Sequence, residues 1–381
     1  MIQVCIIFTI LYTIFLLWLK RGVSRLSTNR LNNNSNSNCS VSVIIAARNE
    51  EKNIATVLEH LTQQEYPEDK YEIIIANDGS EDGTDIIISN FMEIDNRIKH
   101  IKIENPPSNW SPKKWALNQA VDQAEGEILL FTDADCTMKS NWIRSMIKPF
   151  KDTSVGLVMG PSPLEKGGGI WSQLMLMDSH GQDALAAGGI AQNLPLTCSG
   201  RNLAIRQSAF NDVKGYKDIE KYFSGDDDLM LHKIATEGFL ITFVLSHHAE
   251  VISPPPQSFK AFYDQRLRFA SKGKSYFSLH FIKPSFKIIL TSILFSNILV
   301  SFSLGASALT LKIYWLIPWL IKMFGDGTLI YTYCKSLNRK FNLLSFLTNE
   351  LWHSFYVTYF GIMGSFIPIT WKKRTRNPDV N

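Results

Sequence analysis

The chain has 381 residues, of which 45% are hydrophobic and 19% charged, with a formal net charge of +4 at pH 7. The low charged fraction suggests apolar membrane segments that dilute an otherwise soluble domain. This small charge gives no argument for nucleic-acid binding, since dense Lys/Arg runs are missing before the last ten residues. The five scattered cysteines form no CxxC pair, which argues against a zinc site or a disulfide framework and fits a reducing compartment.

The first 20 residues contain an apolar run, Ile2 to Leu19, that carries no charge and is followed by Lys20, Arg21 and Arg25. A signal peptide is the alternative, but the run is long, lacks preceding basic residues and has no small-residue cleavage site after it. We therefore expect residues 1–20 to be a transmembrane anchor with its basic flank in the cytoplasm. Residues 21–40, which include LNNNSNSNCS, are expected to be a polar linker.

Residues 41–282 have the pattern of a soluble domain in which buried strands alternate with amphipathic helices. This alternation predicts an α/β fold with a mostly parallel, Rossmann-like sheet. Ligands of such sheets bind beyond the carboxyl ends of the strands. The expected strands are residues 41–47, 71–78, 98–104 and 126–135, and the expected helices are residues 50–61, 85–91 and 113–124.

Residues 283–381 are expected to form a membrane region with about three hydrophobic segments and a basic tail, KKRTR. The segments are Ile288–Leu311, Ile313–Tyr333 and Leu351–Trp371. The second contains Lys322 and Asp326, and such charges are costly in lipid. One segment is therefore a candidate for an interfacial or re-entrant position, and the sequence leaves the number of crossings open.

Asp133 and Asp135 end the strand GEILLFTDAD. Two carboxylates at this spacing can address one hard cation, Mn²⁺ or Mg²⁺, together with a diphosphate. The cation would neutralise the charge that develops on a departing diphosphate. A solvated turn is the plain alternative for this short motif.

Three other residues are expected at the same edge of the sheet. Asp78 follows the second strand, where it is able to accept hydrogen bonds from a base, although Asp-Gly is also an ordinary turn. Arg48 and Glu50 follow the first strand, where helix capping by the neighbouring asparagine explains the pattern equally well.

Two further clusters lie later in the chain. Ser224 to Leu229 reads SGDDDL, and one of its carboxylates could be a general base, although acidic residues at a helix N-terminus are also common. Gln265 to Phe269 reads QRLRF, in which Arg268 could face a diphosphate and Phe269 could line an acceptor site. A basic juxtamembrane helix is the alternative for that segment.

These motifs, in this order, resemble the membrane-integrated family 2 glycosyltransferases, which include ceramide glucosyltransferase and hyaluronan synthase. The resemblance covers residues 42–273 and implies a GT-A fold. It rests on AARNEE, NDGSEDGT with Asn77 for the first Asp, PKKWALNQA, FTDADC, CSGRNLAIR, SGDDDLML and QRLRFASKG. Gly225 replaces the Glu of the family's ED motif, and Phe269 replaces the Trp of QxxRW.

The resemblance also implies roles for individual residues. Asp226 would be the catalytic base, with Asp227 as the alternative because the acidic run leaves the register open by one. Asp133 and Asp135 would hold the metal ion. Whether His247 or His248 adds a metal ligand is left open. The residues implied to bind the nucleotide sugar are Arg48, Glu50, Asp78, Lys113, Asp133, Gln265, Arg268 and Phe269.

The resemblance finally implies an inverting transfer of a hexose from a nucleotide-diphosphate sugar, most simply a UDP-sugar, to a hydroxyl of a membrane lipid on the cytoplasmic face. The segment 167–180, with Trp171, Leu174, Met175 and Met177, could guide an acyl chain, although a core helix is the commoner explanation. A processive polysaccharide synthase would share all these motifs. A non-catalytic membrane scaffold is the third possibility.

Overall fold

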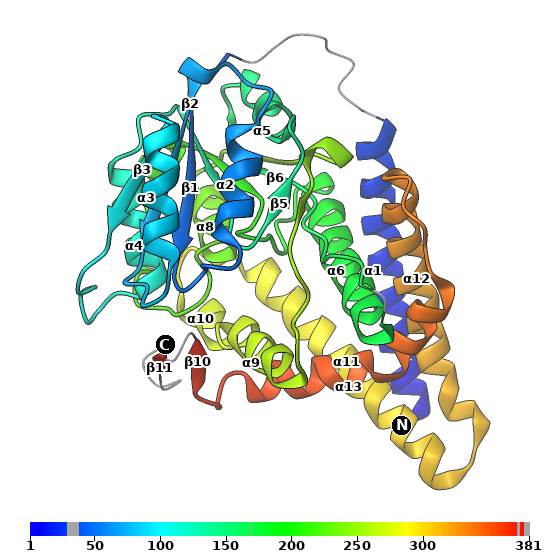
Figure 1. Ribbon diagram of the computed structural model, residues 1–381. Helices are drawn as coiled ribbons and strands as arrows, with labels where there is room; N and C mark the ends of the chain where they lie inside the picture. Colours follow the sequence, from blue (N-terminus) through cyan, green and yellow to red (C-terminus); the bar gives the residue numbers. More distant parts are fainter. Residues whose placement is uncertain (29–37, 168, 372–373, 377–381) are drawn as a thin grey trace. The chain divides into compact units, whose positions relative to one another are not determined.

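The computed structural model describes residues 1–28, 38–167, 169–371 and 374–376 (Figure 1). The chain divides into two compact units, and each is described by itself. The sheet unit comprises Leu31–Glu165, Thr197–Pro254 and Trp371–Asn381, and the helical unit comprises Met1–Arg30, Lys166–Leu196 and Pro255–Thr370. Residues 166–196 and 255–282, which the sequence pattern groups with the α/β domain, thus belong to the helical unit.

The sheet unit is built on a seven-stranded sheet of order β3-β2-β1-β4-β7-β6-β8 (Figure 1). Neighbouring strands are parallel except that β7 is antiparallel to both β4 and β6. The predicted α/β class with a mostly parallel sheet is confirmed. The strands of this sheet are β1 (Val41–Ala47), β2 (Tyr71–Asn77), β3 (Ile98–Lys102), β4 (Ile128–Phe131), β6 (Val155–Met159), β7 (Leu203–Arg206) and β8 (Leu240–Phe243). Strands β5 (Thr137–Met138) and β9 (Val251–Ile252) form a separate antiparallel pair.

Helices cover the sheet because β1, β2 and β4 are apolar on both faces. Val43 and Ile45 of β1 belong to one core cluster with Val57 and Leu58 of α2 and with Trp142 of α5. Helix α4 contacts β1 and β2. The helices of this unit are α2 (Ile54–Thr62), α3 (Thr84–Ile94), α4 (Pro112–Asp122), α5 (Trp142–Ile147), α7 (Gln207–Asp212) and α8 (Asp228–Thr236), with the 3₁₀ turns η1 (Glu68–Lys70), η2 (Lys148–Lys151) and η3 (His247–Ala249).

The helical unit contains the N-terminal helix and most of the C-terminal third of the chain. Helix α1 packs against α12 and α6, and α11 packs against α13 (Figure 1). The elements are α1 (Ile2–Thr28), α6 (Ile170–Ala191), α9 (Phe259–Ala270), α10 (Gly273–Ser278), α11 (Pro284–Thr310), η4 (Ile313–Leu316), α12 (Ile317–Ser336) and α13 (Leu343–Met363). The last described strands of the chain are β10 (Ile369–Trp371) and β11 (Arg374–Arg376).

Two helices in the described part of the chain, α1 and α11, are long and apolar enough to cross a bilayer, with mean hydropathies of 2.4 and 2.0. Helix α1 approaches α6 closely, because a Cβ on Gly188 would lie 2.9 Å from Leu19. Small residues permit such backbone contact between apolar helices. The third expected C-terminal segment differs from the structure, since α13 spans Leu343–Met363 rather than Leu351–Trp371.

Candidate active site

The register of the parallel strands brings the predicted site residues to one edge of the sheet. Ala47 pairs with Asn77 at the ends of β1 and β2, so Arg48 and Asp78 follow side by side. The Asp78 amide donates to the Ala47 carbonyl at 2.8 Å, and Asp78 is 2% exposed. Strand β4 ends one strand away, and Asp133 follows it.

Arg48 and Glu50 also stabilise the loops at this edge. The Arg48 guanidinium donates to the Asp78 carbonyl at 2.5 Å, and the Glu50 amide donates to Thr84 Oγ1 at 2.8 Å. Glu50 Oε2 accepts a hydrogen bond from Asn53 at 2.8 Å. Helix α2 therefore begins at Ile54, four residues later than the sequence pattern suggests.

Asn77, which replaces the family's first Asp, supports the turn that follows it. Its Oδ1 accepts from the Ser80 hydroxyl at 2.6 Å, and its Nδ2 donates to Asp85 at 3.1 Å. Gly79 within that turn has a φ of +61°, in the left-handed region that favours glycine. Asn77 thus fixes the backbone that carries Asp78.

Lys113, in the first turn of α4, lies between two of the predicted carboxylates. Its Nζ is 3.1 Å from Asp133 Oδ1 and 2.9 Å from Asp226 Oδ2. Burial disfavours the charged form of Asp226, but the ammonium groups of Lys113 and Lys114 outweigh it and hold the pKa of that carboxyl well below its ordinary value. Asp226 is therefore ionised, and its charge is neutralised mainly by Lys113.

Asp135 lies in surroundings of excess negative charge. Burial, Asp133 and Glu50 raise the pKa of the Asp135 carboxyl to about 6, and Arg201 offsets part of this rise. Carboxylate oxygens are the donors that a divalent cation prefers, and excess negative charge favours its binding. The chemistry of Asp133 and Asp135 therefore fits the predicted metal ion, and their role as its ligands stays a prediction.

The acidic run at residues 226–228 separates into different environments. Asp227 caps helix α8, because its Oδ1 accepts from the Asp228 amide at 2.7 Å, and its Oδ2 accepts from the Gly200 amide at 3.0 Å. Asp226 instead faces Lys113. Gly225 has a φ of +83°, and a Cβ there would lie 2.7 Å from Leu229, so the local backbone excludes the glutamate of the family motif.

A narrow cavity of about 10 Å³ adjoins Lys113, Asp133 and Asp226, with room for about one water molecule. Gly200 and Tyr216 also line it. Sequence reasoning missed Tyr216, because no local motif surrounds it. Burial and the charge of Asp226 raise the pKa of the Tyr216 hydroxyl well above its ordinary value, so Tyr216 stays neutral in the wall of this cavity.

The segment CSGRNLAIR is mainly structural in its second half. Asn202, 1% exposed, donates to the carbonyls of Pro161 and Ala249 at 2.7 Å each and accepts from the Trp142 indole at 3.0 Å. Arg206 pairs with Glu127 at 2.7 Å. Arg201 contacts Ser253 and donates to the Ser162 carbonyl at 3.0 Å. Its positive charge also lowers the pKa of Asp135 in part.

The remaining predicted residues belong to other elements of the chain. Gln265, Arg268 and Phe269 belong to α9 of the helical unit, where the Arg268 guanidinium lies 5.2 Å from the centre of the Phe269 ring. Their contact with a nucleotide stays a prediction. His247 lies 2.7 Å from Glu250, and His248 lies 2.7 Å from Asn141.

A second group of metal-ligand types lies in the helical unit. Asp326, Glu350 and His353 place their ligand atoms within 4.8 Å of one another. Lys322 Nζ lies 2.5 Å from Asp326, 2.9 Å from Glu350 and 3.1 Å from His353. An ammonium group therefore occupies the position that a metal ion would take.

Comparison with known proteins identifies the family of the chain. The family model "Glycosyl transferase family 2" matches residues 42–213, and "Glycosyl transferase family group 2" matches residues 128–364. The probable glycosyltransferase YdaM of Bacillus subtilis is 29% identical over 258 residues, which is 67% of this chain and 60% of that protein. The beta-monoglucosyldiacylglycerol synthase of Trichormus variabilis is 27% identical over 195 residues, 50% of this chain and 40% of that protein.

The matched region thus spans between two fifths and three fifths of these two relatives. Among solved structures, the mannosyltransferase PcManGT from Pyrobaculum calidifontis, in complex with GDP-Man and Mn²⁺, gives a TM-score of 0.58 at 18% identity. The match covers 93% of this chain and 99% of that one. At this identity the likeness shows a shared fold. The chain belongs to glycosyl transferase family group 2 and is a glycosyltransferase.

Proposed function

We propose that this enzyme moves a hexose from a nucleotide-diphosphate sugar, most simply a UDP-sugar, to a hydroxyl of a membrane lipid, with inversion at the anomeric carbon. The observation that carries the proposal is the position of Lys113 between Asp133 and Asp226. One cationic side chain there touches both a carboxylate predicted to hold the donor and a carboxylate predicted to act as the base.

The donor would lie along the carboxyl edge of β1, β2 and β4. Asp78 would accept hydrogen bonds from the base, and Arg48 and Glu50 would hold the loops around it. Asp133 would face the ribose and diphosphate, and Lys113 would pair with the diphosphate oxygens. Gln265, Arg268 and Phe269 of α9 would cover the nucleotide and the acceptor entrance, as the family resemblance implies.

Asp133 and Asp135 would hold Mn²⁺ or Mg²⁺, which would neutralise charge on the diphosphate leaving group. The local excess of carboxylates and the raised pKa of Asp135 support this assignment. The mannosyltransferase of the same fold was solved with Mn²⁺. Either ion suits this site, because Mn²⁺ and Mg²⁺ both prefer oxygen ligands.

Donor binding would activate the base through Lys113. Before the donor binds, Lys113 holds the pKa of Asp226 low, and a carboxylate of low pKa is a weak base. When Lys113 pairs with the diphosphate, Asp226 loses part of this stabilisation and its pKa rises. Asp226 then takes the proton of the acceptor hydroxyl as the new glycosidic bond forms, and the nucleoside diphosphate leaves from the opposite face.

A lipid acceptor is supported by two features. Helices α1 and α11 are long and apolar enough to cross a bilayer. A relative that matches 50% of this chain is named a beta-monoglucosyldiacylglycerol synthase. By the positive-inside rule, Lys20, Arg21 and Arg25 after the apolar part of α1 favour a catalytic unit on the cytoplasmic face.

The test is sugar-nucleotide turnover by membranes that carry the protein, with Mn²⁺ or Mg²⁺ and radiolabelled donors, beside the Asp135→Ala variant. Lipids and polymer are extracted separately. Label in one discrete lipid, lost in the variant, supports the proposal. Label in polymer assigns a processive polysaccharide synthase instead. Failure to turn over any donor in the presence of either metal ion would contradict the proposed reaction and leave the fold assignment in place.

A further inference from the structure

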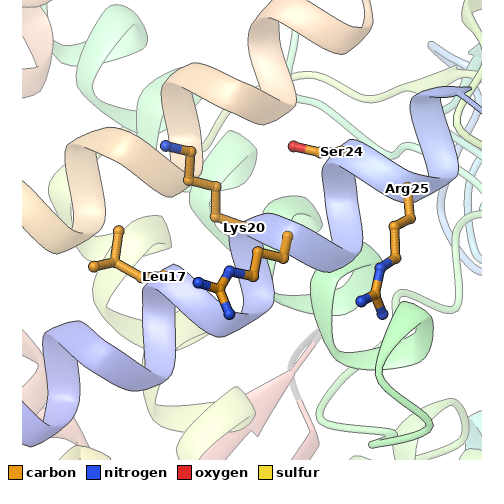
Figure 2. A pocket seen from close by; sticks show the side chains of 5 residues that line it. Leu17, Lys20, Ser24 and Arg25 are labelled. Atoms are coloured by element: carbon orange, nitrogen blue, oxygen red, sulfur yellow. The ribbon is translucent and has the colours of Figure 1, made fainter.

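One face of helix α1 gathers three basic side chains beside a cavity. Leu17, Lys20, Arg21, Ser24 and Arg25 follow the i, i+3, i+4, i+7, i+8 spacing of a single helical stripe. These five residues, here called the α1 basic face, line a cavity of about 460 Å³. Figure 2 shows Leu17, Lys20, Ser24 and Arg25 projecting from successive turns of the helix. The opposite side of α1, which includes Leu16, Leu19 and Val23, is buried.

The charges of this face are unbalanced. Within the described ranges, no carboxylate lies at salt-bridge distance from Lys20, Arg21 or Arg25, and none of their side-chain nitrogens has a hydrogen-bond partner. Two buried basic residues of the helical unit differ, since Arg266 pairs with Asp178 and Lys322 with Asp326. Three like charges on two adjacent turns repel one another, and an anion beside them would relieve that repulsion.

The position of these cations along α1 fits the edge of a bilayer. An α-helix rises about 1.5 Å per residue, so Lys20 lies about 27 Å and Arg25 about 35 Å from Ile2 along the axis. The hydrocarbon core of a bilayer is about 30 Å thick. When the apolar part of α1 fills that core, the α1 basic face lies at the depth of the lipid phosphates.

We propose that the α1 basic face binds the phosphate group of an anionic phospholipid. The two arginines offer planar donor pairs that match phosphate oxygens, and Lys20 and the Ser24 hydroxyl add further donors. Leu17 is the apolar residue among those that line the same cavity, so an acyl chain of the lipid would lie against it. A lipid with a net negative charge is favoured over a zwitterionic one, because a headgroup cation would lie near the same three positive charges. This site is independent of the donor and acceptor of the transfer reaction.

The test is binding of a fluorescent short-chain phosphatidylglycerol to the full chain in neutral detergent, measured by anisotropy. The triple variant K20Q/R21Q/R25Q is expected to bind about 100-fold more weakly, at about fivefold for each cation removed. The matched control is K52Q/K70Q/K139Q, which removes the same charge from the sheet unit and should leave binding unchanged. The variant K20R/R21K/R25K keeps the charge and should retain most of the affinity.

Three outcomes would overturn the proposal. Equal losses in the triple variant and its control would show a non-specific response to net charge. Equal binding of phosphatidylcholine would remove the selectivity for anionic lipid. Full competition by inorganic phosphate at the lipid's own concentration would assign a free-anion site. A thermal melt of each variant separates lost binding from lost folding, because the substituted side chains lie on the outer face of α1.

Discussion

The ammonium group of Lys113 lies 2.9 Å from Oδ2 of Asp226, although the two residues come from distant parts of the sequence. The same ammonium group lies 3.1 Å from Asp133. One positive charge is thus shared between a carboxylate proposed to face the donor and one proposed to accept the acceptor's proton. An anion that drew Lys113 away would change the basicity of Asp226, and under the proposed function this would couple donor binding to the readiness of the base.

Replacing Asp226 by Asn should lower kcat by about 10²- to 10⁴-fold, because the amide cannot accept the hydroxyl proton. The matched control is Asp227→Asn, one residue away. Asn caps helices as well as Asp does, so this variant should keep the α8 cap, lose the hydrogen bond from the Gly200 amide and lose less than about tenfold in kcat. Steady-state turnover of both purified variants decides the register. A larger loss in the Asp227 variant would transfer the role of base to Asp227.

Replacing Lys113 by Gln should shift the pH profile of the reaction. Lys113 holds the pKa of Asp226 down, so its removal raises that pKa. The base must be unprotonated to act, and the acidic limb of kcat/KM therefore moves to higher pH. The donor KM should also rise by about 10- to 100-fold, as for a lost hydrogen bond to a charged group. Lys52→Gln, an exposed change, is the control. An acidic limb that stays in place would remove Lys113 from the activation of the base.

Chelation should abolish sugar-nucleotide turnover, and added Mn²⁺ or Mg²⁺ should restore it in the natural protein. Asp135→Ala should bind the ion at least tenfold more weakly, because it loses one of the two proposed carboxylate ligands. Asp122→Ala, which removes an exposed carboxylate at the end of α4, is the control. The second readout does not depend on activity: it is the rise in melting temperature on metal addition, measured in the inactive Asp226→Asn protein with and without the Asp135→Ala change. An unchanged metal response in the Asp135 variant would contradict the assignment.

Much of the sheet could be predicted from the sequence because β1, β2 and β4 are short apolar runs that end in polar residues. The edge on which Arg48, Asp78 and Asp133 lie follows from the parallel order alone. The sequence pattern does not predict strands β6, β7 and β8, and β7, with the four residues LAIR, is too short for periodicity to indicate a strand. Its antiparallel pairing with β4 brings the Gly200 region beside the carboxyl edge.

The contacts inside the candidate site depend on the folded chain and could not be predicted. Nothing near Asp226 in the sequence indicates that Lys113 is its partner, since these contacts join segments about a hundred residues apart. The same applies to Tyr216, which no motif marks. Gly225 could be interpreted only from its backbone, because a positive φ and the nearby Leu229 exclude a side chain there.

The buried ion pair of Arg266 and Asp178, 2.6 Å apart, should stabilise the attachment of α9. Asp178 also accepts from the Tyr356 hydroxyl at 2.6 Å, so α6, α9 and α13 meet at this carboxylate. Removing one partner leaves a buried charge, and Arg266→Met should cost about 3–5 kcal/mol in free energy of unfolding. The double variant R266M/D178N should lose less than the sum of its single variants.

The control for this prediction lies on the same helix. Lys260 and Asp264 form an i, i+4 pair at 2.9 Å in which the lysine side chain is 82% exposed. Exposed pairs contribute little, so Lys260→Met should change the free energy of unfolding by less than about 1 kcal/mol. Denaturant titration of both variants in the same detergent gives the comparison. Equal effects at the two positions would show that Arg266 has no special part in holding α9.

The cluster of Lys322, Asp326 and Glu350 predicts a gain of metal binding when the lysine is shortened. Lys322→Ala removes the ammonium group and leaves two buried carboxylates uncompensated, which should cost about 3–5 kcal/mol in free energy of unfolding. The same change leaves Asp326, Glu350 and His353 within 4.8 Å of one another, a set of nitrogen and oxygen ligands that suits Zn²⁺. Added Zn²⁺ should therefore raise the melting temperature of Lys322→Ala and leave that of the natural protein unchanged. The double variant K322A/E350Q, which lacks one ligand, should lose the Zn²⁺ response, and a response that survives in it would place the bound ion elsewhere.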